Sequence, residues 1–232
     1  MRSLIIGLGE VGRGLQAALH AGDVRCMVWD DINGKKYPYN IEGFFDIIHV
    51  CFPYSDKFEE YVREYQERCK ARYTVIHSTV PVGTSRRLNA IHSPIRGIHP
   101  NLAEGIKTFP KYLSGGQATY VADYFRKAGL RVVLFDDQET TELGKLLDTE
   151  YYRACIEFAH RAKSLCDIYC LSFHEVYTLF NESYNEGYTK LGHPEYVRPV
   201  LQPIQGPIGG HCVMNNKALL ETELETEITE KK

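Results

Sequence analysis

The sequence of 232 residues lacks a long apolar run, and no stretch approaches the roughly 20 apolar residues that a membrane-spanning helix needs. The N-terminal apolar run, residues 2–6, is too short for a secretory signal and ends at Gly7. Charge of one sign is also not in excess, because the sequence has 27 Lys and Arg and 30 Asp and Glu. A basic surface for nucleic acid or anionic membrane is therefore excluded, and we expect a cytoplasmic protein with neither partner.

The cysteines and histidines lack the spacing of a disulfide framework or a metal site. Seven cysteines are scattered without any CxxC pair. Nine histidines occur singly, with no HxH or HExxH pattern, so no metal site is predicted. His49 and His77 lie inside predicted strands and are interpreted as core histidines. The cysteines stand at Cys26, Cys51, Cys69, Cys155, Cys166, Cys170 and Cys212.

What is present is typical of a globular chain, with 44% hydrophobic and 25% charged residues. The length corresponds to about one and a half domains. Apolar strands alternate with amphipathic helices, which predicts an α/β fold: a Rossmann domain with a doubly wound parallel sheet over 1–137. The predicted strands are 2–6, 24–29, 45–52, 73–77 and 131–135, and the predicted helices are 10–21, 56–70 and 117–129.

After residue 137 the apolar spacing becomes helical throughout. It predicts a smaller all-helical domain, 138–220, with one long helix over 140–171. Ser172 and Glu175 form a capping-box pattern that starts a second helix, expected to end near Asn185. We expect a loop over 192–210, a last helix from Cys212 and a disordered charged tail over 221–232.

Residues 7–12, Gly7-Leu8-Gly9-Glu10-Val11-Gly12, form a GxGxxG pattern between the first strand and the first helix. The glycines permit a tight turn, close approach of a pyrophosphate and close helix packing. Asp30 ends the second strand, where a carboxylate binds the ribose 2′-hydroxyl and repels a 2′-phosphate, so NAD is favoured over NADP. FAD, S-adenosylmethionine and a purely structural turn are the alternatives.

Further segments stand, in order, at 77–84 (HSTVPVGT), 99–105 (HPNLAEG), 142–145 (ELGK) and 206–212 (GPIGGHC). Together with the glycine loop they resemble the nucleotide-sugar (UDP-glucose/GDP-mannose) 6-dehydrogenase family. That family belongs to the wider group of 6-phosphogluconate and β-hydroxyacid dehydrogenases. The resemblance covers residues 1 to about 220.

The resemblance implies oxidation of a primary alcohol to a carboxylate with NAD, through a thiohemiacetal and a thioester on Cys212. It also implies that Lys145 stabilises an oxyanion or moves a proton, that Glu104 is the acidic site residue, and that Thr79 lies near the nicotinamide. Further candidate cofactor contacts are Phe52 and Pro53. Candidate substrate contacts are His99, Asn101, Thr149, Gly209, Gly210, His211 and Asn216.

The sequence also departs from the family pattern. Thr149 replaces an asparagine, and Asn216 replaces an aspartate and cannot act as a base. The chain ends 20 residues past Cys212, where full members continue into a second Rossmann-like domain that binds UDP. A single-step oxidation of the β-hydroxyacid type therefore competes with the two-step reaction. A non-catalytic NAD-binding sensor or partner subunit is the alternative from another class.

Tyrosine is abundant, with 16 residues, and many of them fall in the helical part. Such side chains bury a large area with a polar tip and are enriched at interfaces. A long helix in so small a domain cannot cover all its faces. We therefore expect a homodimer through the helix 140–171, as the resemblance also implies.

Overall fold

The computed structural model describes residues 1–30, 41–203, 216 and 218–220. These residues form two compact units, the first reaching Leu146 and the second beginning at Leu147. Each unit is described by itself.

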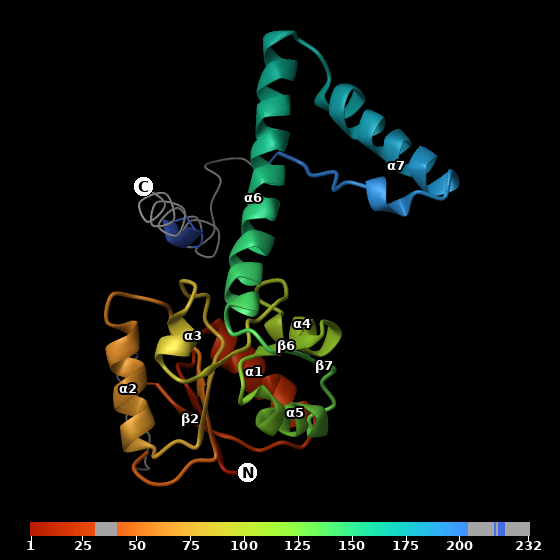
Figure 1. The fold of residues 1–232 in the computed structure, drawn as a ribbon. Coiled ribbons are helices and arrows are strands. Elements are labelled where there is room, and N and C mark those ends of the chain that lie inside the picture. Colours follow the sequence, from red (N-terminus) through yellow and green to blue (C-terminus); the bar gives the residue numbers. More distant parts are fainter. Residues whose placement is uncertain (31–40, 204–215, 217, 221–232) are drawn as a thin grey trace. The chain divides into compact units, whose positions relative to one another are not determined.

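The first unit is built on a sheet of seven strands in the order β2-β1-β3-β4-β5-β6-β7 (Figure 1). Strands β1 to β5 are parallel, as the apolar strand pattern predicts. The carboxyl ends of β1 to β4 therefore meet at one edge of the sheet. The strands are β1 Ser3–Ile6, β2 Met27–Trp29, β3 Ile47–Val50, β4 Tyr73–Ile76, β5 Ile91–His92, β6 Lys111–Ser114 and β7 Val132–Phe135.

Helices cover both faces of this sheet, because successive strand residues point to opposite faces and most are apolar. Ile5 and Val75 face a core shared with α1, α4 and α5, whereas Leu4 and Ile76 face a core shared with α2. This confirms the predicted α/β Rossmann-like fold. The helices are α1 Glu10–Ala21, α2 Phe58–Arg68, α3 Thr84–Arg87, α4 Leu102–Thr108 and α5 Ala118–Lys127.

The sheet differs from the prediction at one junction, where β6 pairs antiparallel with β5. The segment between them holds only the short helix α4, so the chain re-enters the sheet from the end at which β5 left it. A long crossover would be needed for a parallel return. The predicted parallel sheet is therefore confirmed except at this one junction, and β5, β6, α3 and α4 were not predicted.

Helix α6, Glu139–Ile168, confirms the predicted long helix to within three residues at either end. In the second unit, Ser172 accepts a hydrogen bond from the Glu175 amide at 3.4 Å, so the predicted cap is present. The following helix is a π-helical stretch, His174–Leu179, continued by α7, Phe180–Lys190. It is therefore longer than expected.

In residues 192–203, the described part of the expected loop, the structure has a 3₁₀ turn at Pro194–Tyr196. The last predicted helix is helical at 216 and 218–220, while its start and the predicted charged tail lie outside the described residues.

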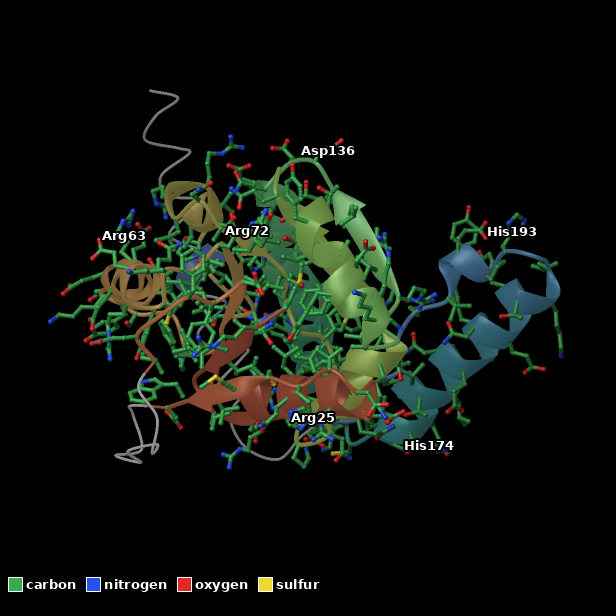
Figure 2. All side chains as sticks on the ribbon, turned by 90° about the horizontal axis from the view of Figure 1, so that it is seen from below. Arg25, Arg63, Arg72, Asp136, His174 and His193 are labelled. Carbon is green, nitrogen blue, oxygen red and sulfur yellow. The ribbon has the colours of Figure 1, made fainter. Side chains whose placement is uncertain are left out.

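Charged side chains such as Arg25, Arg63, Arg72 and Asp136 lie on the outside of the first unit (Figure 2). Within the described part of the chain, no helix is long and apolar enough to cross a membrane. No group of three or more His, Cys, Asp or Glu among the described residues could hold a metal ion.

Candidate functional site

The glycine loop joins β1 to α1 at the carboxyl edge of the sheet, and each glycine has a distinct steric role. Gly7 has φ +92°, and a Cβ there would lie 2.9 Å from the Phe52 amide nitrogen. A Cβ on Gly12 would lie 1.9 Å from the Gly7 carbonyl oxygen, so only glycine lets helix and loop pack this closely. A Cβ on Gly9, in contrast, would meet no atom within 4 Å. The middle of the loop is therefore open to a ligand.

Asp30 directly follows β2 and is only 4% exposed. It lines a cavity of about 310 Å³ together with Ile6, Gly7, Phe52, Tyr61, Glu64 and Tyr65. The structure thus brings together three of the predicted cofactor residues, Gly7, Asp30 and Phe52. Pro53, the next residue, is exposed.

A second surface cleft, of about 750 Å³, lies between α1 and α4. Three predicted site residues line it, namely Glu10, Asn101 and Glu104. His99 contacts the Glu10 carboxylate through Nδ1, so the segment before α4 is tied to the glycine loop. Glu104 is exposed and pairs with Lys107 Nζ at 3.1 Å.

Thr79 and Lys145 are partly buried and belong to segments that hydrogen bonds hold together. His92 provides one link: its Nε2 lies 3.1 Å from the Ser78 carbonyl oxygen and its Nδ1 lies 2.7 Å from Thr141 Oγ1. Burial, together with the smaller effects of the Lys111 and Lys145 charges, lowers the pKa of His92 to about 3. The neutral imidazole therefore joins the residue before Thr79 to the first turn of α6.

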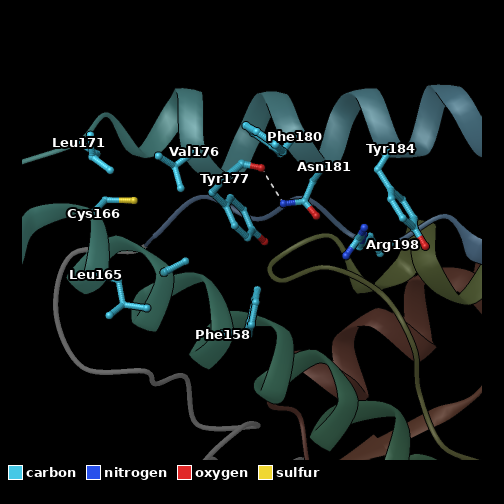
Figure 3. A pocket seen from close by; sticks show the side chains of 11 residues that line it. Phe158, Leu165, Cys166, Leu171, Val176, Tyr177, Phe180, Asn181, Tyr184 and Arg198 are labelled. Carbon is cyan, nitrogen blue, oxygen red and sulfur yellow. Dashed lines mark hydrogen bonds between the residues drawn. The ribbon is translucent and has the colours of Figure 1, made fainter. Parts of the chain in front are cut away.

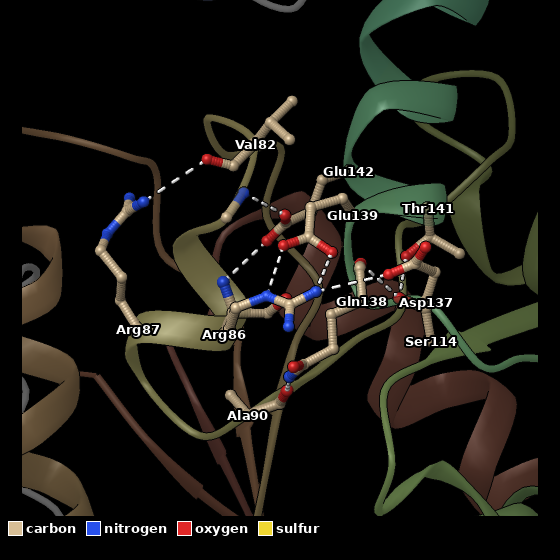
Figure 4. Close-up of polar contacts among 12 residues, drawn as sticks. Val82, Arg86, Arg87, Ala90, Ser114, Asp137, Gln138, Glu139, Thr141 and Glu142 are labelled. Atoms are coloured by element: carbon tan, nitrogen blue, oxygen red, sulfur yellow. Dashed lines mark hydrogen bonds and ion pairs between the residues drawn. The ribbon is translucent and has the colours of Figure 1, made fainter.

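Glu142, fully buried in α6, provides the other link (Figure 4). Its two carboxylate oxygens accept hydrogen bonds from the Gly83 and Ser85 amides, each at 2.7 Å. Burial raises the pKa of this carboxyl, and these hydrogen bonds oppose the rise. The turn after Thr79 is thereby fixed against α6, one helical turn before Lys145.

A surface ion pair reinforces the start of α6. Arg86 donates two hydrogen bonds to the Glu139 carboxylate, both at 2.6 Å, and a longer one to Asp137 at 3.3 Å. The hydrogen bond from Arg86 lowers the pKa of Glu139 to about 2. The beginning of α6 is thus held to α3 by both buried and exposed carboxylates.

In the second unit, the two positions that depart from the family pattern contact each other. The Asn216 amide donates a hydrogen bond to Thr149 Oγ1 at 3.1 Å, and Asn216 is 6% exposed. Spacing alone could not have predicted this pair, because 67 residues separate the two positions. The remaining candidates, Gly209, Gly210, His211 and Cys212, lie outside the described residues.

The second unit also carries an apolar groove of about 420 Å³ between α6 and the following helix (Figure 3). Phe158 and Leu165 face it from α6, and Val176 and Phe180 from the opposite helix. Asn181 donates a hydrogen bond to the Tyr177 carbonyl oxygen, one turn earlier on the same helix, at 2.6 Å. Apolar side chains therefore dominate this groove.

Three residues that line the Asp30 cavity were not predicted from the sequence, namely Tyr61, Glu64 and Tyr65 of α2. Their spacing of three and four residues places them on one helix face, which was the available signal. Glu142 is the first residue of the ELGK segment. Its hydrogen bonds to the Gly83 and Ser85 amides could not be predicted, because nothing in the sequence places that turn beside it.

No family model and no curated protein matches this chain. Solved structures do match. A UDP-D-ManNAc dehydrogenase from Pyrococcus horikoshii aligns with TM-score 0.72 and 17% identity, covering 94% of this chain and 63% of that one. This chain thus spans less than two thirds of that protein's length.

Two other matches differ in reaction. A 3-hydroxyisobutyrate dehydrogenase from Mycobacterium tuberculosis, solved with L-serine, aligns with TM-score 0.65 and 14% identity, covering all of this chain and 89% of that one. A reductive aminase from Aspergillus terreus, in complex with NADPH and ethyl levulinate, aligns with TM-score 0.58 and 15% identity, covering 82% and 74%. The chain therefore shares its fold with these two dehydrogenases and with the reductive aminase.

Proposed function

We propose that this chain is an NAD-dependent dehydrogenase that oxidises an alcohol group of a sugar, nucleotide sugars included. The observation that carries the proposal is the glycine loop, with its open centre at Gly9, beside a cavity lined by the buried carboxylate of Asp30. A nicotinamide dinucleotide needs both features, one for the pyrophosphate and one for the adenosine ribose.

The residues present fit such a cofactor. The first turn of α1 offers backbone N–H groups and a partial positive charge to the pyrophosphate. Asp30 would accept hydrogen bonds from the ribose hydroxyls. Glu64 lines the same cavity, so two carboxylates would oppose a 2′-phosphate. This supports NAD over NADP.

The nicotinamide ring, when bound, supplies the hydride acceptor. In our proposal, Lys145 takes the proton of the reacting alcohol or stabilises the oxygen, and Thr79 borders the ring. Glu142 and His92 are positioning residues, because they fix the segments of Lys145 and Thr79 to each other. Glu104, Asn101 and His99 would contribute from the cleft beside the glycine loop.

A single-step oxidation of a β-hydroxyacid is the second candidate. Two observations favour it: the whole chain aligns with 89% of the 3-hydroxyisobutyrate dehydrogenase, and Thr149 and Asn216 replace the polar groups that the two-step family carries. A thioester route would instead require Cys212. Replacing Cys212 by Ser distinguishes the routes, since a single-step enzyme keeps its activity.

We also propose that the chain forms a homodimer through α6. On the part of this helix in the second unit, large apolar side chains are exposed, with Tyr151 at 63%, Phe158 at 62% and Ile168 at 72%. Such a density of exposed apolar surface is typical of a covered interface. Sedimentation analysis tests this, and a monomer at micromolar concentration would contradict it.

The dinucleotide proposal is tested by calorimetry with NAD and NADP on the unmodified protein and on two variants. Asp30→Asn removes the buried charge, and Asp123→Asn, at an exposed position on α5, is the matched control. A lost charge-assisted hydrogen bond is worth about 1.5–3 kcal/mol, so NAD should bind roughly 10- to 100-fold more weakly to Asp30→Asn. The control should bind like the unmodified protein, and equal affinities of all three would contradict the assignment.

Turnover is tested by following NADH formation with nucleotide sugars, free sugars and small β-hydroxyacids. Oxidation of a sugar supports the lead proposal, and oxidation of β-hydroxyacids alone supports the second. Tight NAD binding without turnover of any of them would instead indicate a non-catalytic NAD-binding subunit.

A further inference from the structure

A chain of buried polar side chains runs through the core of the first unit. Its members are Ser3 in β1, Tyr124 in α5, His49 in β3, His77 just after β4, and Lys111 in β6. None is more than 4% exposed. Buried polar groups of this kind need complete hydrogen bonding, so their proton positions are not free to vary independently.

Each link in this chain has hydrogen-bond geometry. Ser3 Oγ lies 2.9 Å from Tyr124 Oη, and Tyr124 Oη lies 3.3 Å from His49 Nε2. His49 Nδ1 lies 3.0 Å from His77 Nε2, and His77 Nδ1 lies 3.1 Å from Lys111 Nζ. A neutral imidazole donates from one nitrogen and accepts at the other. The two histidines must therefore point their N–H groups the same way along the chain.

The direction in which the histidine N–H groups point depends on Lys111, whose Nζ lies near three acceptors. These are the Ser93 carbonyl oxygen at 2.7 Å, the Pro94 carbonyl oxygen at 3.3 Å and His77 Nδ1 at 3.1 Å. An ammonium has three N–H donors, one for each. When Lys111 donates to His77 Nδ1, that nitrogen accepts and shares the ammonium with the Ser93 carbonyl oxygen 2.7 Å away, so each histidine carries its proton on Nε2. The chain donates from Lys111 toward Tyr124.

A neutral amine has only two N–H donors, which the two carbonyl groups use. His77 Nδ1 also lies 2.7 Å from the Ser93 carbonyl oxygen, so it can carry a proton and donate there. His77 Nε2 then accepts from His49 Nδ1–H, and His49 Nε2 accepts from the Tyr124 hydroxyl. Every donor is satisfied, but the chain now runs the other way.

Lys111 is the member of this cluster that changes charge near neutral pH. Burial lowers its pKa to about 7, while the nearby Cys51 thiol and the Arg96 cation act in opposite directions. Burial raises the pKa of Cys51 to about 12, so it stays a thiol. Arg96 is permanently charged and donates to the Pro110 carbonyl oxygen at 2.9 Å.

The other groups packed around Lys111 stay neutral in this range. Burial lowers the pKa of His49 to about 3 and that of His77 well below its usual value. His92, which also acts on this cluster, has its pKa lowered by burial to about 3. On the α5 side, burial raises the pKa of Tyr124, and the Phe125 ring centre lies 5.8 Å from Lys111 Nζ.

We propose that protonation of Lys111 reverses the hydrogen-bond chain from His77 to Ser3, making it a pH-sensitive element in the core of the first unit. One proton taken up at Lys111 moves both histidine protons from Nδ1 to Nε2 without charging either ring. Thr79 lies only two residues after His77, so the reversal acts next to the candidate site. The inference does not depend on the proposed enzymatic function.

The test is histidine NMR on the full chain with isotope-labelled histidine, titrated from about pH 6 to about pH 9, the range that brackets the pKa of Lys111. Long-range proton–nitrogen correlations show which ring nitrogen carries the proton. We expect His49 and His77 to carry it on Nε2 at the acid end and on Nδ1 at the alkaline end, with one shared midpoint. Unchanged tautomers across the range would overturn the proposal.

Lys111→Met should fix His77 in the Nδ1–H form at every pH, because only the Ser93 carbonyl oxygen remains as a partner. Lys127→Met, at an exposed position on α5, is the control and should titrate like the unmodified protein. A tautomer change that persists in Lys111→Met would overturn the assignment to Lys111. If this variant does not fold, the titration of the unmodified protein still decides the proposal.

Discussion

Replacing Lys111 by Met should change how the stability of the protein depends on pH. The side chain is 3% exposed, and burial lowers the pKa of its ammonium from 10.5 to about 7. At about 1.4 kcal/mol per pH unit, holding this charge in the core costs on the order of 5 kcal/mol below pH 7. Methionine has a similar shape and carries no such cost.

The sign follows from proton uptake. Because the folded pKa of Lys111 is lowered, the unfolded chain binds more protons between about pH 7 and about pH 10.5. The free energy of unfolding therefore rises with pH across this window, and the cost is fully present below it. In Lys111→Met this contribution is absent, so the stability gap between the variant and the unmodified protein shrinks as the pH rises.

Urea denaturation of both proteins from about pH 6 to about pH 9 measures this gap, which should fall by roughly 2–3 kcal/mol. The difference between the two free energies of unfolding removes the contribution of groups that titrate equally in both proteins. Lys127→Met serves as the exposed control and should show a constant gap. Parallel stability curves for Lys111→Met and the unmodified protein would refute a buried, titrating lysine.

Two further substitutions test the loop and its support. Gly12→Ala would place a Cβ 1.9 Å from the Gly7 carbonyl oxygen. It should cost about 1–3 kcal/mol and abolish NAD binding, whereas Gly187→Ala, with no atom within 4 Å, should be neutral or stabilising in the same melting and calorimetric assays. Glu142→Ala leaves the Gly83 and Ser85 amides without their acceptor and should cost about 2–5 kcal/mol in urea denaturation. If Glu142→Ala had the same free energy of unfolding as the unmodified protein, Glu142 would not stabilise the 83–85 turn and this account would be contradicted.

The sequence predicted a helix or strand correctly where the residues of that element alone determine its structure. The helix from Glu10 to Ala21 was predicted with both bounds as observed, because the glycines, the apolar spacing and the preceding strand agree. The position of Asp30 directly after a short apolar strand next to the loop was predicted for the same reason.

Tertiary contacts decided the rest. Strand β6 and its antiparallel pairing depend on where α4 turns the chain back, which leaves no periodicity in the sequence. Lys111, read alone, is an ordinary lysine before a short apolar pair. Its burial follows from the Ser93 and Pro94 carbonyl groups and from His77, which no spacing rule places beside it.

The central claim is that the cavity beside Asp30 and the glycine loop hold a nicotinamide dinucleotide. A crystal structure of the chain grown with NAD tests it most directly. We predict the adenosine ribose on the Asp30 carboxylate and the pyrophosphate over Gly9 and the first turn of α1. NAD bound at another place, or no bound NAD at concentrations that saturate a dehydrogenase, would contradict the claim.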